Sequence, residues 1–361
     1  MEKADPPSDE LVIADTRIKR GERVSVDLTV AKLYTHTPLD VPIHVIRGRK
    51  SGPRLFISAA IHGDEINGVE IIRRLLKSSS IRKIRGDLIL IPVVNVYGFI
   101  NHSRYLPDRR DLNRCFPGSE TGSLAARLAN VFMTEIVNQC THGIDLHTAA
   151  SHRNNLPQIR ANLDDPETER IAKAFGVPVI LNSNLRDGSL REAAAEQDMP
   201  MLLYEGGEAL RFNEVAIRLG VRGILRVLRA LEMLPPRKTK TAMVGKTSNK
   251  AKQYVARASH WVRAPISGVF NVQVALGTVI QKDGVLGIIS EPLGQTETRV
   301  ISPYEGIVIS ISNLPLVNEG DALIHIARFG DVEAVADQLE SFQDMALPEY
   351  STVAPLDSNS K

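Results

Sequence analysis

Cysteine is scarce in this chain of 361 residues, which contains only Cys115 and Cys140. Two cysteines are too few for a disulfide framework, and a reducing compartment fits this number. Long apolar runs are also missing, because no segment approaches the roughly 18 to 20 apolar residues of a membrane span. Residues 1–10 are polar and contain proline where a signal peptide would be apolar. We therefore expect a cytoplasmic protein that has no membrane partner.

An excess of charge of one sign is the third absence. Lysine and arginine total 44, aspartate and glutamate total 42, and the formal net charge is only +2. A protein that binds the phosphate groups of nucleic acid over a large surface would need a clear surplus of basic residues. Nucleic acid is therefore not expected as a partner.

The chain does contain enough apolar residues, 43%, for a sizeable core, and its length favours two domains. Between residues 11 and 235, short apolar runs alternate with segments of helical spacing. Strands separated by helices predict an α/β domain with a largely parallel sheet, and sites in such sheets gather at the carboxyl ends of strands. Residues 1–10 have the composition of a disordered N-terminus, residues 236–253 that of a basic linker, and residues 331–361 form a C-terminal tail.

Residues 254–330 show a different pattern, with β segments separated by glycines, and they contain a repeat. The stretch Ala-Pro-Ile-Ser-Gly-Val-Phe at 264–270 is similar to Ser-Pro-Tyr-Glu-Gly-Ile-Val at 302–308, and the residues that follow also correspond. Two repeats of this size can fold into a small closed or sandwiched β unit with little exposed edge. We therefore predict a second, all-β domain.

The first chemical signal is the sequence His62-Gly-Asp-Glu65, which stops an apolar strand abruptly. An imidazole and a carboxylate three residues apart can reach one metal ion from a tight turn. Catalytic zinc commonly takes three protein ligands, and a second short strand that breaks at His147 supplies the third. A single histidine is more often structural. Two histidines at strand ends, with a glutamate correctly spaced from the first, favour a metal site. Structural roles are expected for the other histidines, and among them His102 and His152 are the alternative candidates for the metal site.

The second signal is the arginine-rich segment 101–118, which follows a strand. A guanidinium next to an amide donor, as in Asn113-Arg114, can hold a carboxylate, while a further cation can polarise a scissile carbonyl. Arg104 is preferred over its competitors Arg109 and Arg110 for this second role, because loop arginines are usually solvated and that explanation fits Arg109 and Arg110 equally well.

The third signal is Glu205, which follows the apolar strand Met201–Tyr204 and precedes two glycines. Metal-assisted hydrolysis needs a carboxylate that takes a proton from the activated water and passes it to the leaving amine. A turn acid is the simpler explanation. The position at the end of the strand favours Glu205 over Glu208 for the catalytic role.

Taken in order, His62-Gly-Asp-Glu65, Asp111-Leu-Asn-Arg-Cys-Phe116, Asp145-Leu-His147 and Glu205 resemble the succinylglutamate desuccinylase and aspartoacylase family, which belongs with the zinc carboxypeptidases. The resemblance covers roughly residues 50–235. It implies a three-layer fold with a mixed, largely parallel sheet.

The resemblance also implies the roles of individual residues. One zinc ion per chain would be bound by His62, Glu65 and His147, and Glu205 would be the general base and acid. The substrate's α-carboxylate would be held by Asn113 and Arg114, and the arginine before this pair would be Arg104. Arg191 and Arg160 are candidates for a second acidic group on the substrate.

The C-terminal repeats resemble the biotinyl and lipoyl carrier fold. Such a carrier needs a lysine at the hairpin between its halves, yet no lysine occurs between Lys282 and Lys361. We expect an unmodified β unit that shapes or caps the entrance of the site, or that brings subunits together in a homo-oligomer.

The implied reaction is hydrolysis of the amide bond of a small N-acyl amino acid by a metal-activated water. Two alternatives stay open: a zinc carboxypeptidase that acts on short peptides, and a non-catalytic relative that binds a small ligand. The acyl group, the amino acid and the native metal also stay open, because His2Glu sites accept cobalt or manganese as well.

Overall fold

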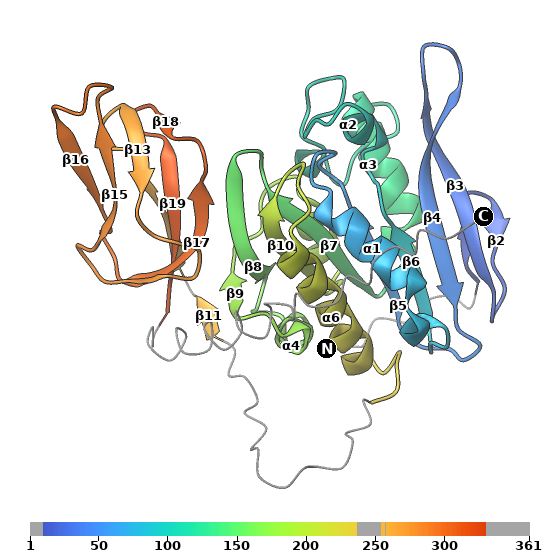
Figure 1. Ribbon diagram of the computed structural model, residues 1–361. Helices are drawn as coiled ribbons and strands as arrows, with labels where there is room; N and C mark the ends of the chain where they lie inside the picture. Colours follow the sequence, from blue (N-terminus) through green and yellow to red (C-terminus); the bar gives the residue numbers. More distant parts are fainter. Residues whose placement is uncertain (1–9, 237–253, 257, 330–361) are drawn as a thin grey trace, which may run out of the picture.

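A computed structural model describes residues 10–236, 254–256 and 258–329 (Figure 1). Residues 1–9 of the predicted N-terminal end, residues 237–253 of the predicted linker and the predicted tail 331–361 lie outside the described residues.

The helices are α1 (Asn67–Lys77), α2 (Val96–Ile100), α3 (Leu124–Glu135), α4 (Pro166–Phe175), α5 (Leu190–Ala195) and α6 (Glu214–Ala230), with the 3-10 turns η1 (Ser79–Ile81), η2 (Leu112–Arg114) and η3 (Val137–Gln139). The strands before the predicted linker are β1 (Val12–Ile13), β2 (Thr16–Arg17), β3 (Arg23–Lys32), β4 (Pro38–Arg47), β5 (Arg54–Ala59), β6 (Asp87–Ile91), β7 (His142–Ala149), β8 (Arg153–Ala161), β9 (Val179–Asn182) and β10 (Met201–Glu208). The strands after it are β11 (Tyr254–Ala256), β12 (Ala258–Arg263), β13 (Gly268–Val272), β14 (Val279–Ile280), β15 (Val285–Ser290), β16 (Glu297–Ile301), β17 (Gly306–Ser312), β18 (Leu316–Val317) and β19 (Ala322–Arg328).

A 13-stranded sheet organises the molecule, with the main order β12-β19-β17-β8-β10-β7-β5-β6-β4-β3. Strands β6, β5, β7 and β10 run parallel at its centre. Strand β4 pairs antiparallel with β6 on one side, and β8 pairs antiparallel with β10 on the other. The predicted α/β fold with a mixed, largely parallel sheet is confirmed.

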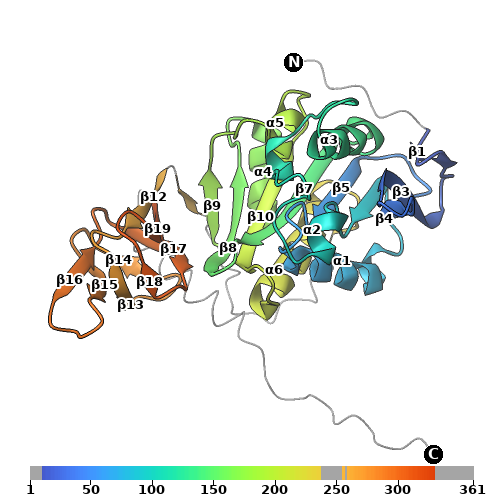
Figure 2. The ribbon, with the colours of Figure 1, turned by 90° about the horizontal axis from the view of Figure 1, so that it is seen from above.

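Helices cover both faces of this sheet, so the catalytic part has three layers (Figure 2). Helices α1, α4 and α6 bury their apolar residues in one core cluster, while α3 and α5 belong to a second cluster with strands β3 and β4. In α6 the buried residues recur at three- and four-residue spacing, which is the pattern of a helix with one apolar stripe. The parallel strands β5, β6 and β7 are almost wholly buried between these two layers.

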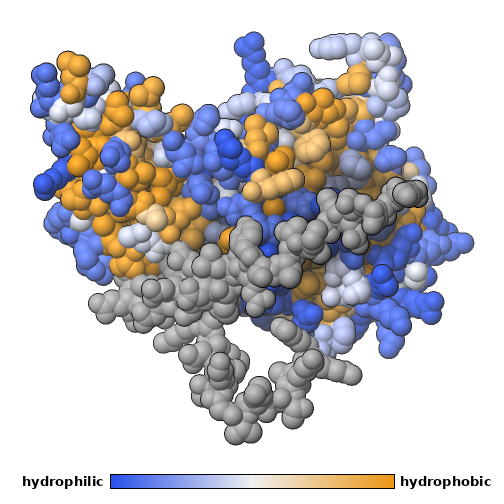
Figure 3. Space-filling model, viewed as in Figure 1, coloured by the Kyte–Doolittle hydropathy of each residue, from blue (hydrophilic) through white to orange (hydrophobic). Residues whose placement is uncertain are grey.

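The C-terminal strands form the predicted all-β unit, and the repeat explains its pairing. Strand β13 of the first repeat pairs with β18 of the second, and β14 of the first pairs with β17 of the second. The four-stranded sheet β16-β15-β13-β18 shares a core with β12, β17 and β19. Apolar surface is visible over this unit in Figure 3, and its exposed apolar side chains include Leu293, Leu314 and Leu316. Its role in association between subunits stays a prediction.

The β unit is joined to the catalytic sheet through backbone pairing. Strand β17 pairs antiparallel with β8, and β11 pairs parallel with β9. The sheet therefore continues from one predicted domain into the other, and the exact division at residue 236 stays a prediction. In the described part of the chain, no helix is long and apolar enough to cross a membrane.

Candidate active site

The sequence His62-Gly-Asp-Glu65 forms a tight turn between β5 and α1, as the sequence predicted. The turn is closed by a hydrogen bond of 3.0 Å from the backbone N–H of Glu65 to the carbonyl of His62. Gly63 is required here because a β-carbon would overlap the backbone between Gly98 and Phe99. The turn thus brings an imidazole and a carboxylate to the carboxyl edge of the parallel strands.

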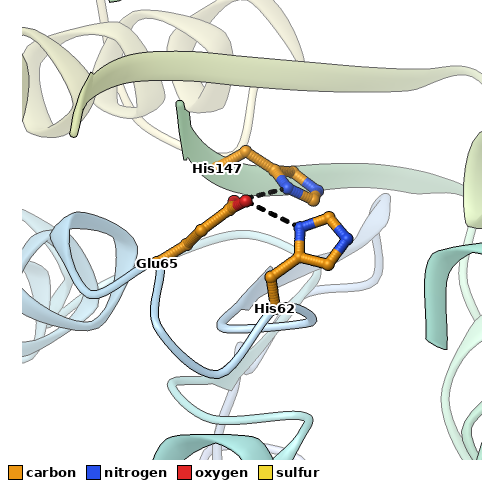
Figure 4. Close-up of side chains that lie close together, drawn as sticks. All are labelled: His62, Glu65 and His147. Atoms are coloured by element: carbon orange, nitrogen blue, oxygen red, sulfur yellow. Dashed lines mark hydrogen bonds and ion pairs between the residues drawn. The ribbon is translucent and has the colours of Figure 1, made fainter. Parts of the chain in front are cut away.

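His62, Glu65 and His147 meet in one buried cluster (Figure 4). The Nδ1 atom of His62 lies 2.7 Å from Oε1 of Glu65, and Nδ1 of His147 lies 2.8 Å from Oε2 of the same carboxylate. One ligand atom from each residue lies within 4.8 Å of the others, and the three residues are 3%, 1% and 5% exposed. His147 lies within β7, two residues before its end, and not at its last residue as predicted.

Two further carboxylates fix the orientation of the imidazoles. Oδ1 of Asp111 lies 3.0 Å from Nε2 of His62, and Oδ2 of Asp145 lies 2.6 Å from Nε2 of His147. Metal-binding histidines almost always bond to such an outer partner, which fixes the tautomer and turns the other nitrogen to the metal. This arrangement leaves both Nδ1 atoms directed at the centre of the cluster.

The electrostatics of the cluster suit a divalent cation. Burial opposes ionisation of Glu65, but His62 and His147 outweigh it and hold the pKa of this carboxyl well below its usual range. Burial likewise opposes charge on His147, but Asp145 and Glu65 raise its pKa well above the ordinary value. The site therefore attracts positive charge, and a bound cation would take the place of the protons on the imidazoles.

Of the three competing arginines, only Arg104 lies at this cluster. Its guanidinium contacts Oε1 of Glu65 at 3.1 Å and Oδ2 of Asp111 at 2.9 Å. Burial opposes its charge, but the two carboxylates outweigh this effect and raise the pKa of Arg104. Arg109 and Arg110 are exposed and do not line the cavity.

Glu205 lies on β10, beside His147 on β7, because the two residues are paired across these parallel strands. The pairing is interrupted directly after Glu205, so the residue sits at an irregularity inside β10 and not at the strand's end. Nε of Arg160 lies 3.2 Å from one carboxylate oxygen, and the side chain of Asn155 donates a hydrogen bond to the other. Both oxygens of Glu205 are therefore held in a fixed orientation.

The predicted carboxylate-binding residues differ in how much of their side chain is free. Asn113 is buried and accepts a hydrogen bond of 2.9 Å from the backbone N–H of Leu190 through its side-chain oxygen. Arg114 is exposed towards the cavity and bonds only to the carbonyl of Asn113 among the described residues. The guanidinium of Arg191 already contacts the side chain of Ser183 at 3.0 Å and neighbouring carbonyls. Burial and the charge of nearby Arg160 lower the pKa of Arg191 to about 10, so it stays charged at neutral pH.

One cavity of about 210 Å³ is lined by all the predicted site residues, namely His62, Glu65, Arg104, Asn113, Arg114, His147, Arg191 and Glu205. Sequence reasoning gave no role to several of its lining residues, namely Asp145, Arg153, Asn155, Arg186, Trp261 and Ser310. For Asp145 a role beside His147 could have been inferred, because it precedes His147 by two residues and therefore faces the same side of its strand. Trp261 and Ser310 come from the C-terminal β unit and have no local signal.

A larger cavity of about 1300 Å³ lies elsewhere, at the opposite edge of the parallel strands. Its lining includes Arg49, Lys50, Arg82 and Lys83 but no histidine. Among the described residues, the histidine and carboxylate cluster that could hold a metal lies only in the smaller cavity. The smaller cavity is therefore the candidate active site.

Comparison with known proteins identifies the family of the chain. The succinylglutamate desuccinylase/aspartoacylase catalytic domain matches residues 51–231, half of the chain, and the chain belongs to this family of deacylases. An N-alpha-acetyl-L-2,4-diaminobutyric acid deacetylase from Halomonas elongata is 30% identical over 164 residues, which are 44% of this chain. The match spans only 48%, about half, of that relative's length.

Solved structures share the fold over most of the chain. A succinylglutamate desuccinylase/aspartoacylase from Rhodobacter sphaeroides is 25% identical, with a TM-score of 0.76 over 86% of this chain and 97% of its own. The product-bound ectoine utilization protein EutE (DoeB) from Ruegeria pomeroyi is 21% identical, with a TM-score of 0.76 over 90% of this chain and 99% of its own. The second likeness concerns the fold alone.

Proposed function

We propose that this chain is a zinc-dependent hydrolase that cleaves the amide bond of a small N-acyl amino acid. The observation that carries the proposal is the buried cluster of His62, Glu65 and His147, with Glu205 on the adjacent strand. Membership of a deacylase family supports the reaction class, and the acetylated amino acid named for the Halomonas relative supports a small amide substrate.

The cluster fits zinc in ligand type and number. Two imidazoles and one carboxylate leave an open position, as in other catalytic zinc sites, and about one ion per chain is expected. The carboxylates of Glu65, Asp111 and Asp145 lie against the two imidazoles, with Arg104 as a neighbouring cation, so negative charge exceeds positive charge once a bound divalent ion replaces the protons of the imidazoles. A bound ion would supply Lewis acidity to the substrate carbonyl and to water.

The other catalytic and substrate-binding roles belong to side chains of the chain itself. Glu205 takes the proton of the attacking water and returns it to the leaving amine, while Arg160 and Asn155 keep its carboxylate in position. Arg104 places a fixed positive charge beside the cluster, where it stabilises negative charge that develops on the carbonyl oxygen. Arg114 lines the cavity with a guanidinium that bonds only to the carbonyl of Asn113 among the described residues, and its remaining N–H groups would bind the α-carboxylate of the amino acid.

The size of the cavity favours this reaction over cleavage of peptides. Pockets for drug-sized ligands commonly measure about 300–1,000 Å³, whereas this cavity measures about 210 Å³. Trp261 and Ser310 form part of its wall, so the β unit narrows the space beyond Glu205. A non-catalytic binding role is disfavoured because such a protein would not need an oriented carboxylate beside the metal cluster.

The proposal is tested by incubating the zinc-loaded protein with N-formyl, N-acetyl and N-succinyl amino acids and with dipeptides, and by measuring release of free amine. We expect turnover of N-acyl amino acids and little cleavage of dipeptides. Equal or faster cleavage of dipeptides would favour the carboxypeptidase alternative. Absence of turnover with every compound would overturn the proposal.

Replacing Arg114 by alanine is expected to weaken substrate binding more than chemistry. Loss of a charge-assisted hydrogen bond costs roughly 1.5–3 kcal/mol, so KM should rise about 10- to 100-fold while kcat changes by only a few-fold. Arg110→Ala is the matched control, because Arg110 comes from the same loop and its side chain is 61% exposed outside the cavity. A fall in kcat with KM unchanged would contradict a binding role for Arg114.

A further inference from the structure

The larger cavity, of about 1300 Å³, lies where the parallel strands β5 and β6 begin, opposite the candidate active site. Strand β4 and helix α6 both end at this edge (Figure 1). Its lining residues come from four segments, namely 21–23 at the start of β3, 46–50 at the end of β4, 82–85 before β6 and 229–236 at the end of α6. No lining residue is common to this cavity and the candidate active site.

Positive charge dominates the lining of this cavity. Its basic lining residues are Arg23, Arg47, Arg49, Lys50, Arg82, Lys83, Arg85 and Arg229, and among the described residues its only acidic lining residue is Glu232. The whole chain has a formal net charge of only +2, so the imbalance is local. A cleft whose walls carry one sign of charge focuses the electric field and concentrates the opposite ion. The cavity therefore attracts anions.

The carboxylates at this cavity are already engaged by arginines. Glu232 lies 3.4 Å from the guanidinium of Arg85. Asp87, which is buried at the start of β6, contacts Arg54 at 3.1 Å and Arg47 at 3.7 Å. One buried carboxylate thus serves two guanidinium groups, and the protein's own acids do not balance the basic lining.

Backbone hydrogen bonds hold the four segments in place. The bonds measure 2.8 to 3.0 Å and run from the N–H of Gly21 to the carbonyl of Arg47, from that of Gly48 to Gly86, and from that of Arg85 to Met233. The basic side chains are therefore carried by a fixed frame and not by independent loops. A site formed before the ligand arrives loses less entropy on binding.

Part of the lining is apolar and buried. Ile46, Ile84, Met233 and Leu234 line the cavity, and each is at most 8% exposed. Nε of Arg229, which also lines the cavity, has no hydrogen-bond partner among the described residues. Ligand sites commonly combine an apolar surface with a few polar groups, and a buried donor without a partner indicates that an acceptor is missing.

These features favour a ligand with several negative charges. Cations at the end of a helix are favourable without any ligand, but this explains Arg229 alone, because the other basic lining residues lie outside α6. Guanidinium forks match the oxygens of phosphate, and a chain of phosphates can engage several cations where a single carboxylate engages one or two. Pockets for drug-sized ligands measure about 300–1,000 Å³, so this cavity has room for a nucleotide.

We propose that this basic cavity is a second ligand site, separate from the active site, which binds a small molecule that carries a chain of two or more phosphate groups. The basic residues of segments 46–50 and 82–85 bind the phosphates. The apolar residues Ile84 and Met233 contact the remainder of the ligand. The inference does not rest on the proposed hydrolase function, because no residue of the metal cluster takes part in it.

Titration with phosphate compounds of increasing charge tests the proposal. Phosphate, pyrophosphate, tripolyphosphate and ATP are titrated by calorimetry into the zinc-loaded, full-length protein. Excess magnesium keeps the phosphates from removing zinc, and elemental analysis checks the zinc content afterwards. We expect saturable binding that tightens with the number of phosphates, with phosphate at least about tenfold weaker than tripolyphosphate. Equal affinity for ATP and tripolyphosphate would identify the phosphate chain as the whole recognised group, and tighter binding of ATP would identify a nucleotide.

A variant of the lining tests the position of the site. Four exposed side chains are neutralised together by Arg49→Gln, Lys50→Gln, Arg82→Gln and Lys83→Gln. Affinity for tripolyphosphate should fall about 10- to 100-fold, the combined loss of several exposed ion pairs. The matched control neutralises the same number of exposed charges outside both cavities, by Lys32→Gln, Arg109→Gln, Arg110→Gln and Arg222→Gln. The control should bind tripolyphosphate nearly as tightly as the unchanged chain.

The single tryptophan distinguishes the two cavities. Trp261 is the only tryptophan in the sequence, and it lines the smaller cavity. Its fluorescence should therefore stay unchanged while tripolyphosphate binds at the opposite edge of the sheet. A saturable change in this fluorescence, with equal affinity in the unchanged chain and in the variant of the basic lining, would place the phosphates in the active site and overturn the second site.

Two further results would also overturn the proposal. One is the absence of binding with every phosphate compound, or an equal loss of affinity in the variant and in its control. The other is tighter binding of a short single-stranded DNA than of ATP, which would assign the basic residues to nucleic acid and not to a small ligand. Neither result bears on turnover of N-acyl amino acids, so the hydrolase proposal stands or falls by its own assay.

Discussion

The variant that carries both His62→Ala and His147→Ala is expected to bind no zinc and to show no turnover, whereas the unchanged chain binds about one zinc ion. Both imidazoles direct Nδ1 at Glu65, and a single buried carboxylate cannot hold the ion alone. Elemental analysis of the purified proteins after incubation with zinc measures this difference. Circular dichroism checks that the variant remains folded, since it leaves Asp111 and Asp145 without their imidazole partners.

The matched control for this variant is His102→Ala with His152→Ala. These two histidines are exposed, and neither lines the cavity. The control protein should therefore contain as much zinc as the unchanged chain and turn over substrate at the same rate. Equal zinc in all three proteins would show that the cluster is not the metal site, and the hydrolase proposal would lose its main support.

The sequence indicates the cluster of His62, Glu65 and His147 because these residues interrupt local patterns. His62 and Glu65 follow the apolar strand β5, and His147 lies near the carboxyl end of β7, on the same edge of the parallel sheet. In parallel sheets, sites form at the carboxyl ends of strands, so residues at these ends are predicted to lie close together even when no tertiary contact is known. The same reasoning found Glu205, although its exact position at an irregularity inside β10 could not be seen, because pairing register depends on the partner strands.

The outer wall of the cavity could not be predicted in the same way. Ser310 and Asn155 become neighbours only because β17 pairs with β8. All the elements from α4 to β16 lie between these two strands in the chain. Such long-range pairing leaves no periodicity in the sequence at either position. Arg191 stays a predicted substrate-binding residue that lines the cavity, and the structure adds that its guanidinium is already bonded to Ser183 and Asn184, which the sequence alone could not indicate. Arg186, which was not singled out, also lines the cavity, and the positive charges of Arg114 and Arg160 act on its guanidinium.

Replacing Glu205 by glutamine is expected to lower kcat by about 10²- to 10⁴-fold, the usual contribution of a general acid–base group, without loss of zinc. Glutamine has nearly the same shape and can still accept from Asn155, but its amide cannot take a proton from water. Glu205 is not a member of the His62, Glu65 and His147 cluster, so the metal content should not change. Steady-state kinetics and elemental analysis on the same preparation measure both effects.

Glu208→Gln provides the control that makes this test specific. Glu208 lies three residues further along β10 and bonds to the backbone N–H of His152 and to Asn313, away from the cavity. If Glu205 is the general base, only the Glu205→Gln variant loses turnover. Full turnover in Glu205→Gln would make the assignment wrong, and a comparable loss in Glu208→Gln would mean that the two substitutions act by disturbing β10 and its pairing with β8. The two carboxylates differ in one respect that decides the outcome, because only Glu205 is paired with His147 across the sheet and therefore lies beside the cluster of His62, Glu65 and His147.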